Sequence, residues 1–271
     1  MTKRKRGVVM ADRISELPDE VLNQQLRVSS LRNGGGVPSL QPCIDVGSNF
    51  LRAVKLKNVR LAGGGLEYFL CNCPALERLA IYDIPDLRIL RVVGLSIPLK
   101  YLVIKDCDNI ESIVIRDANL VSFTYSGHKM NLIIRNVPLL AEVSIVQGYT
   151  KCDFLDVAFT QLESCSQLHI LKLLKKIFKR AECSHRCLKV VEMLRYYGRR
   201  GDARLVKYLT TAAVNLEEIG VSPIESFYNL DTDEKREELE SDRARKDRAT
   251  KELKQIVPST VKVAGTLMLL D

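Results

Sequence analysis

Leu76-Glu-Arg-Leu79-Ala-Ile81 has the pattern apolar-x-x-apolar-x-apolar, and this pattern decides the fold because it recurs along the chain. In the middle of the chain, successive copies start 11, 12, 11, 10 and 20 residues apart, and the longest interval holds one weaker copy around 130–134. Such regular self-similarity marks an internal repeat. The clear copies start at Leu51, Leu76, Leu87, Leu99, Ile110, Leu120, Leu140, Leu168, Leu188 and Leu216.

The last two apolar residues of each copy, such as Leu79 and Ile81, lie two positions apart and therefore point to the same face of a short strand. One short strand cannot bury that face alone, but stacked copies form a continuous apolar wall. A leucine-rich repeat takes about 20–29 residues per turn. We therefore predict that one turn comprises two copies, with a strand on each side.

The flanking repeats are longer and leave room for helices, which we predict at 61–71 and 202–214. The predicted fold class is α/β: an irregular, strand-rich leucine-rich-repeat solenoid with helices in the N- and C-terminal repeats.

A self-match within the chain supports these repeats. Leu70-Cys-Asn-Cys73-Pro-Ala-Leu76 aligns with Leu162-Glu-Ser-Cys165-Ser-Gln-Leu168, so we expect Cys73 and Cys165 to be small buried residues where a helix turns into a strand. The alignment also makes 168–173 a strand. The alternative for 168–180 is a basic amphipathic helix that binds a membrane surface or a calmodulin-like groove.

The net charge of +8 is unevenly distributed, with 41 Lys and Arg against 33 Asp and Glu. Lys3, Arg4, Lys5 and Arg6 form either a candidate nuclear localisation signal or a solvated start of the chain. Residues 172–207 carry twelve basic and three acidic residues. This second cluster overlaps the repeat and has no recognised nucleic-acid motif, so a solvated rim or an acidic protein partner is favoured over nucleic acid.

The sequence excludes several other classes. No uncharged run reaches the length of a membrane span, and acidic residues directly follow the basic start, unlike in a secretory signal. Eight cysteines are too dilute for a disulfide scaffold, so we expect a nuclear or cytoplasmic protein, or one found in both. The sequence has no recognisable nucleophile elbow or phosphate-binding loop. We therefore expect no enzymatic activity and no cofactor.

One alternative concerns a metal. Cys183, His185 and Cys187 offer metal-type side chains, but their spacing is not that of a structural zinc site. We therefore predict no metal centre and interpret these cysteines as reduced thiols.

Near the N-terminus, Met10-Ala-Asp-Arg-Ile-Ser-Glu-Leu-Pro-Asp-Glu-Val-Leu22 resembles the opening of the F-box of plant F-box proteins with leucine-rich repeats. Leu66-Glu-Tyr-Phe-Leu-Cys-Asn-Cys-Pro-Ala-Leu-Glu-Arg-Leu79 resembles their repeats, and Leu188-Lys-Val-Val-Glu-Met-Leu-Arg-Tyr-Tyr-Gly198 resembles their C-terminal region. The resemblance implies a substrate-recognition subunit of an SCF-type cullin ubiquitin ligase, whose F-box docks on the linker subunit while the repeats hold a target protein.

The family's docking motif corresponds here to Leu17, Pro18, Val21 and Leu22. The match stops at Leu22, and the chain has no Trp, whereas the family's module continues and usually ends in a basic-Trp dipeptide. The alternative is therefore a ligase-independent or decoy protein that binds its partner through the same repeats. A basic nucleic-acid-associated factor is a third and weaker hypothesis.

The target protein is expected to contact residues that lie between the apolar anchors of successive strands. The candidates for this face are Arg78, Tyr101, Val103, Thr124 and Ser144.

The predicted organisation has five parts. They are a basic tail at 1–9, an incomplete F-box at 10–31, leucine-rich repeats at 48–150, C-terminal repeats at 151–228, and a charged helix with a final strand at 229–271. In the last part, 231–254 is predicted to be an exposed helix or a linker, and 257–261 with 263–270 is predicted to form the final strand.

Overall fold

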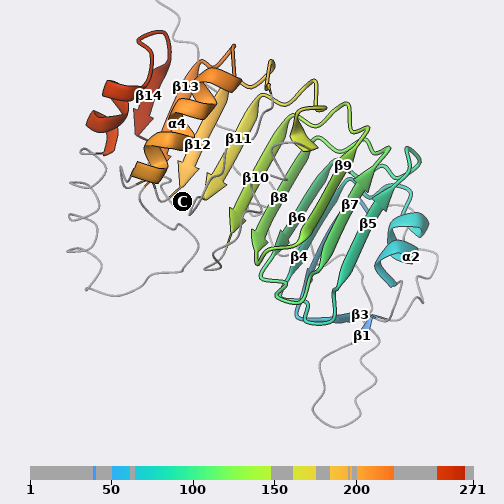
Figure 1. The fold of residues 1–271 in the computed structure, drawn as a ribbon. Coiled ribbons are helices and arrows are strands. Elements are labelled where there is room, and N and C mark those ends of the chain that lie inside the picture. The colour runs from blue at the N-terminus through green and yellow to red at the C-terminus, as the bar shows by residue number, and fades with distance from the viewer. Residues whose placement is uncertain are drawn as a thin grey trace, which may run out of the picture.

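Figure 1 shows the computed structural model of the chain. The structure describes residues 39–40, 51–61, 65–147, 161–174, 184–194, 196, 200–222 and 249–265. The basic tail and the F-box-like segment at 10–31 lie outside these residues.

Parallel strands dominate the described chain (Figure 1). Two short strands, β1 (Ser39–Leu40) and β3 (Arg60–Leu61), pair with each other. A three-stranded sheet comprises β5 (Ile89–Val93), β7 (Ser112–Arg116) and β9 (Asn131–Arg135). A nine-stranded sheet contains β2 (Ala53–Lys57), β4 (Arg78–Tyr82), β6 (Tyr101–Lys105), β8 (Ser122–Gly127), β10 (Glu142–Gln147), β11 (Ile170–Leu174), β12 (Val190–Leu194), β13 (Glu218–Ser222) and β14 (Lys262–Gly265).

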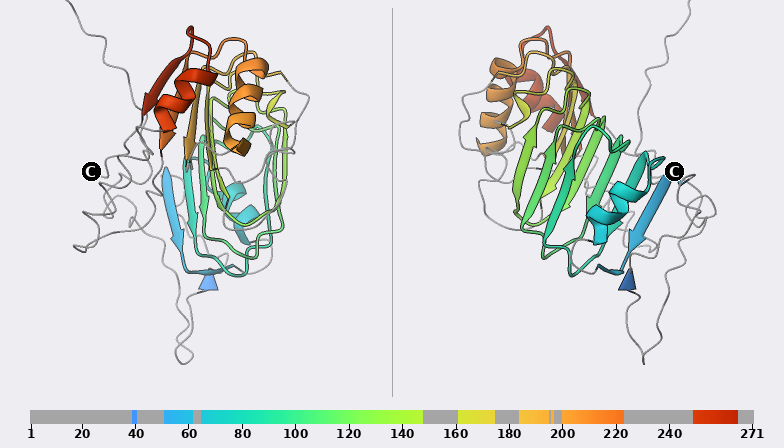
Figure 2. Two further views of the ribbon diagram at one scale, coloured as in Figure 1. Left: turned by 60° about the vertical axis from the view of Figure 1, so that its left-hand side comes forward. Right: turned by 90° about the vertical axis from the view of Figure 1, so that its right-hand side faces the viewer.

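The alternation of the two sheets confirms that one turn of the solenoid comprises two sequence copies. β4 pairs with β6, and β5, which lies between them in the sequence, pairs with β7 in the other sheet. The turns stack in chain order from β2 at one end to β14 at the other (Figure 2). The predicted fold class is therefore confirmed.

Helices occur in the flanking repeats, as predicted. α2 (Gly65–Asn72) precedes β4, and α4 (Arg200–Ala212) precedes β13. One side of α4 is buried, because Leu205, Val206 and Leu209 are fully buried and belong to the main apolar core. A helix therefore replaces the second strand of the turn where the repeat is longer.

The apolar anchors form one continuous core along the stack. In β4 the anchors Leu79 and Ile81 are fully buried, and in β8 the same positions hold the larger Phe123 and Tyr125, also fully buried. Because side chains alternate along a strand, each anchor pair points inward while its neighbours point outward. Burial of these aligned anchors is the main stabilising contribution of each turn.

Asn, Asp or Gly follows many of the strands, and this is a sequence signal that the repeat pattern did not include. These residues have positive φ, a conformation that Asn, Asp and Gly tolerate better than other residues. The turn that they form directs the backbone N–H of Asp83 to the carbonyl of Lys105 at 3.1 Å, and that of Asp106 to Ser126 at 3.0 Å. The positions are Asn58, Asp83, Gly94, Asp106, Asp117 and Asn136.

The predicted equivalence of Cys73 and Cys165 is confirmed. Both are buried, and the carbonyl of each accepts a hydrogen bond from the backbone N–H three residues later, at 3.1 and 3.2 Å. Cys107 occupies the corresponding place before β7. Burial raises the pKa of all three thiols to about 11, so they are protonated at neutral pH and serve packing.

Two segments distinguish between the sequence hypotheses. Residues 170–174 form β11, so the amphipathic-helix interpretation is wrong for that part; 175–180 lie outside the described residues. At the C-terminus, 249–256 is helical and buries Ala249 and Leu253 against the core. The prediction of a strand at 257–261 is wrong, because the N–H of Val261 donates to the carbonyl of Pro258 in a turn, and β14 follows.

Candidate functional site

The side chains of the nine-stranded sheet that point away from the apolar core form what we call the outer face. The five residues predicted to contact a target all lie on it. Arg78 is in register with Tyr101. In the next row, Val103 is in register with Thr124, and Thr124 with Ser144. The structure thus brings together on one continuous surface residues that are far apart in the sequence.

Val103 lies on the outer face but is buried under its neighbours, so it supports this surface and is not accessible to a target protein. Only 3% of Val103 is exposed, and its neighbour Ala80 is fully buried. Tyr82 and Tyr101 pack against this pair. Small side chains in the middle of the face therefore support two aromatic rings, whereas Thr124 and Ser144 are partly exposed.

Cations from β2, β4 and β6 lie close to the two aromatic rings, which are Tyr82 on β4 and Tyr101 on β6. The ammonium groups of Lys55 and Lys105 lie 5.4 and 5.9 Å from the centroid of the Tyr82 ring. The guanidinium of Arg78 lies 5.1 Å from the ring of Tyr101. These are cation–π distances. Of these residues, only Arg78 and Tyr101 were among the predicted candidates; the others could have been found as further alternate positions of the same strands.

The charges on β10, β11 and β12 form a different arrangement. The ammonium of Lys172 lies 3.3 Å from a carboxylate oxygen of Glu142 and 3.9 Å from one of Glu192. Oε1 of Glu192 is buried and has no hydrogen-bond partner among the described residues. Burial raises the pKa of Glu192, although Lys172 acts in the opposite direction. The strands thus hold a partly buried triplet of one cation and two carboxylates.

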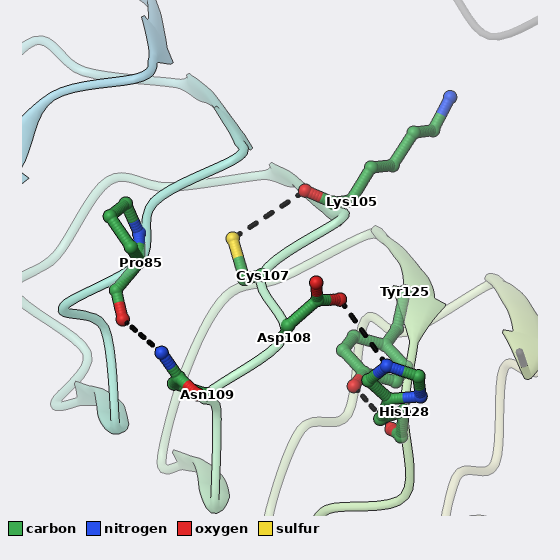
Figure 3. A network of polar contacts seen from close by, with 7 residues as sticks. All are labelled: Pro85, Lys105, Cys107, Asp108, Asn109, Tyr125 and His128. Carbon is green, nitrogen blue, oxygen red and sulfur yellow. Dashed lines mark hydrogen bonds and ion pairs between the residues drawn. The ribbon is translucent and has the colours of Figure 1, made fainter. Parts of the chain in front are cut away.

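Polar contacts hold the turns at the carboxyl ends of β6 and β8 (Figure 3). The hydroxyl of Tyr125 donates to the carbonyl of His128, whose ring lies 3.5 Å from Asp108. Asn109 donates to the carbonyl of Pro85 in the preceding turn at 2.8 Å. A Cβ at Gly127, the last residue of β8, would lie 2.9 Å from the Tyr125 hydroxyl, so any larger residue there would displace that buried ring. Hydrogen bonds and an ion pair therefore fix the turns that follow β6 and β8, at one edge of the nine-stranded sheet.

Asparagine side chains repeat the contact made by Asn109. Asn119 donates to the carbonyl of Leu95 at 3.1 Å, and Asn215 to that of Arg186 at 2.6 Å. Each asparagine directly precedes the first apolar anchor of its copy. These bonds satisfy turn carbonyls that the strand ladders leave unpaired.

A cavity with a volume of about 350 Å³ lies between the turns at 162–168 and 184–188. His185 lines it and is itself buried, and burial lowers the pKa of its imidazole, with Glu163 acting in the opposite direction. Cys183 is outside the described residues. Within the described part of the chain, no three His, Cys, Asp or Glu side chains are grouped as a metal site would require. Because the zinc alternative includes Cys183, the absence of a metal centre stays a prediction.

Within the same described ranges, no helix is long and apolar enough to span a membrane. Stacked parallel strands with buried, mostly leucine and isoleucine anchors define a leucine-rich-repeat solenoid, and asparagine side chains bridge three of its turns. This class is typical of non-enzymatic protein-interaction modules.

The family model of At1g61320/AtMIF1, LRR domain, matches residues 36–175, and the chain belongs to this family. Comparisons with curated proteins and with solved structures gave no match. The family match supports the resemblance to plant leucine-rich-repeat proteins, and it begins after the F-box-like segment at 10–31.

Proposed function

We propose that this protein is the substrate-recognition subunit of an SCF-type cullin ubiquitin ligase and binds a target protein on the outer face of its nine-stranded sheet. The observation that carries the binding role is the continuous outer face, on which Arg78, Tyr101, Thr124 and Ser144 from four strands present partly exposed side chains. A rigid row of such strands suits recognition, because it orders side chains before the partner arrives.

The ligase part of the proposal rests on Leu17, Pro18, Val21 and Leu22. Pro18 is suited to the first turn of a helix, and Val21 and Leu22 then offer apolar side chains to the groove of a linker subunit. The chemistry of ubiquitin transfer would belong to other subunits, and this chain would hold the target in place.

Co-purification with the linker subunit tests this part. The full chain is expected to retain the linker subunit, and a Leu17→Asp/Leu22→Asp variant is expected to lose it, because two buried carboxylates oppose apolar docking. Thr124→Arg, on the outer face, is the control and is expected to retain the linker subunit. If the unaltered chain retains none, the ligase role is wrong for this protein.

The second candidate is a ligase-independent interaction protein or decoy that uses the same outer face. It is favoured by one specific observation: the match to the docking motif stops at Leu22, and the chain has no Trp. The same co-purification separates the two candidates, since only the first needs the linker subunit.

Site-specific photo-crosslinking tests the binding face itself. A photoreactive residue at Thr124 is expected to give discrete adducts in extract of the source tissue, and one at Ile133 is expected to give none. Ile133 is the matched control, because it is also partly exposed and mid-strand but lies on β9 in the other sheet. Adducts from Ile133 alone would place the partner on the wrong sheet for this proposal.

A further inference from the structure

We propose that the outer face of β2, β4 and β6 binds an extended acidic segment of the target protein. This inference rests on the proposed protein-binding function and adds the chemical class of the partner.

The first observation is the charge on the outward positions. From β2 to β8 these positions carry no carboxylate and four cations, which are Lys55, Lys57, Arg78 and Lys105. From β10 onwards the outward positions carry two cations, Lys172 and Lys262, which are paired with three carboxylates, so this half has no net positive charge. The carboxylates are Glu142, Glu192 and Glu218. Only the first half of the outer face therefore presents a net positive charge to a partner.

The second observation is the packing around these cations. Lys55 and Lys105 both lie against the ring of Tyr82, and Arg78 lies against that of Tyr101. A cation held against a ring loses less side-chain freedom when a carboxylate binds it. The rings themselves offer apolar contact area beside the charges, as protein-binding surfaces commonly do.

The third observation is the neighbouring strand. The outward positions of β8 are Ser122, Thr124 and Ser126, all partly exposed. Their hydroxyl groups can donate hydrogen bonds to carboxylates or to peptide carbonyls. The three spacings from β2 to β8 span about 14 Å, so an extended segment of about five residues crosses all four strands.

Acidic residues border this surface and limit where a partner can lie. Asp83 and Asp106 follow β4 and β6 in the turns at one rim. At the opposite rim, Glu77 lies 3.1 Å from the ammonium of Lys100. Because like charges repel, the carboxylates of a bound segment are directed to the middle of the face and away from the Asp83 rim.

The three-stranded sheet provides a matched comparison. Its outward positions include Arg91, Arg116 and Arg135 and, again, no carboxylate on β5, β7 or β9. No aromatic ring lies among these outward positions. The two surfaces thus separate the effect of positive charge from that of the cation–aromatic arrangement.

The experiment measures binding of a fluorescein-labelled peptide of alternating Glu and Ser by anisotropy, with the Gln-for-Glu peptide as the uncharged probe. The Glu peptide is expected to bind the full chain at low salt and to weaken as salt is added. In a Lys55→Gln/Arg78→Gln/Lys105→Gln variant the dissociation constant is expected to rise about tenfold, which is about 1.4 kcal/mol. The Arg91→Gln/Arg116→Gln/Arg135→Gln variant is expected to stay within about twofold, since it loses the same charge elsewhere.

Circular dichroism checks that both triple variants fold, and the single exposed change Lys55→Gln replaces the first variant if it does not. Equal weakening in the two triple variants, or equal binding of the Glu and Gln peptides, would overturn the inference. If that happens while crosslinks at Thr124 persist, the binding function stands and only the acidic class is wrong. If the Thr124 crosslinks are also absent, the proposed function itself is wrong.

Discussion

Replacing Phe123 with alanine is expected to lower the free energy of unfolding by about 3–5 kcal/mol, the usual cost of removing a large buried ring. Phe123 is fully buried in β8, in register with Leu102 on one side and Val143 on the other. The two neighbouring turns are held by their own backbone ladders and cannot collapse into the space that the ring leaves. Because a folded domain is stable by only about 5–15 kcal/mol, this loss is large.

Urea denaturation followed by circular dichroism measures this change. Thr124→Ala is the matched control, because it lies next to Phe123 in the same strand but points to the outer face. It is expected to change the free energy of unfolding by about 0.5 kcal/mol or less. Similar values for the two variants would contradict the assignment of the inner and outer faces.

Replacing Lys172 with methionine is expected to destabilise the fold by about 3 kcal/mol near neutral pH, because it removes the only described cation between two partly buried carboxylates. Methionine keeps most of the volume of the lysine side chain, so the effect reports charge. The negative charges of Glu142 and Glu192 would then repel each other without the positive charge of Lys172 between them.

Lys189→Met is the control for this change. The ammonium of Lys189 lies 2.7 Å from Glu217, a shorter contact than either made by Lys172, but both side chains are more than half exposed. Exposed pairs are screened by solvent and contribute little to stability, so this variant is expected to be destabilised much less than Lys172→Met. The double variant Lys172→Met/Glu192→Gln is expected to recover much of the loss. Equal destabilisation by Lys172→Met and Lys189→Met would contradict the argument from burial.

The pH dependence of the Lys172 effect follows from the pKa of Glu192. Burial raises the pKa of this carboxyl in the folded state, so the folded chain binds its proton more tightly than the unfolded chain does. Stability from this group is therefore present below the ordinary pKa of Glu, about 4.3, and is lost as pH rises through the raised value. Loss of Lys172 raises that pKa further. The destabilisation is expected to shrink as pH falls towards about 4, and urea midpoints across this range measure it.

The repeat pattern predicted much of the fold, and particular residues show why. Leu79 and Ile81 lie two positions apart, which is a local property of a strand, and their recurrence every 10 to 12 residues implied stacking. The aligned cysteines Cys73 and Cys165 placed β11 correctly. The strand predicted at 257–261 was wrong because this short segment contains Pro258 and Ser259, which suit a turn as well as a strand end.

The outer face was only partly predictable. Arg78, Tyr101 and Thr124 were identified because they alternate with the anchors. The contacts of Lys55 and Lys105 with one ring of Tyr82 were missed, since they depend on three strands from different turns. The Lys172 triplet was missed for the same reason, as its members come from β10, β11 and β12.

The sequence by itself determined which residues point inward, because side-chain alternation within a strand and the spacing of the copies are both local properties. Only the tertiary structure decided which outward residues become neighbours. In the nine-stranded sheet the intervals between paired residues vary, from 20 between Ser122 and Glu142 to 44 between Glu218 and Lys262, so loops and helices of different length set each register. The position of Lys172 between two carboxylates, and of Tyr82 between two lysines, follows from that register.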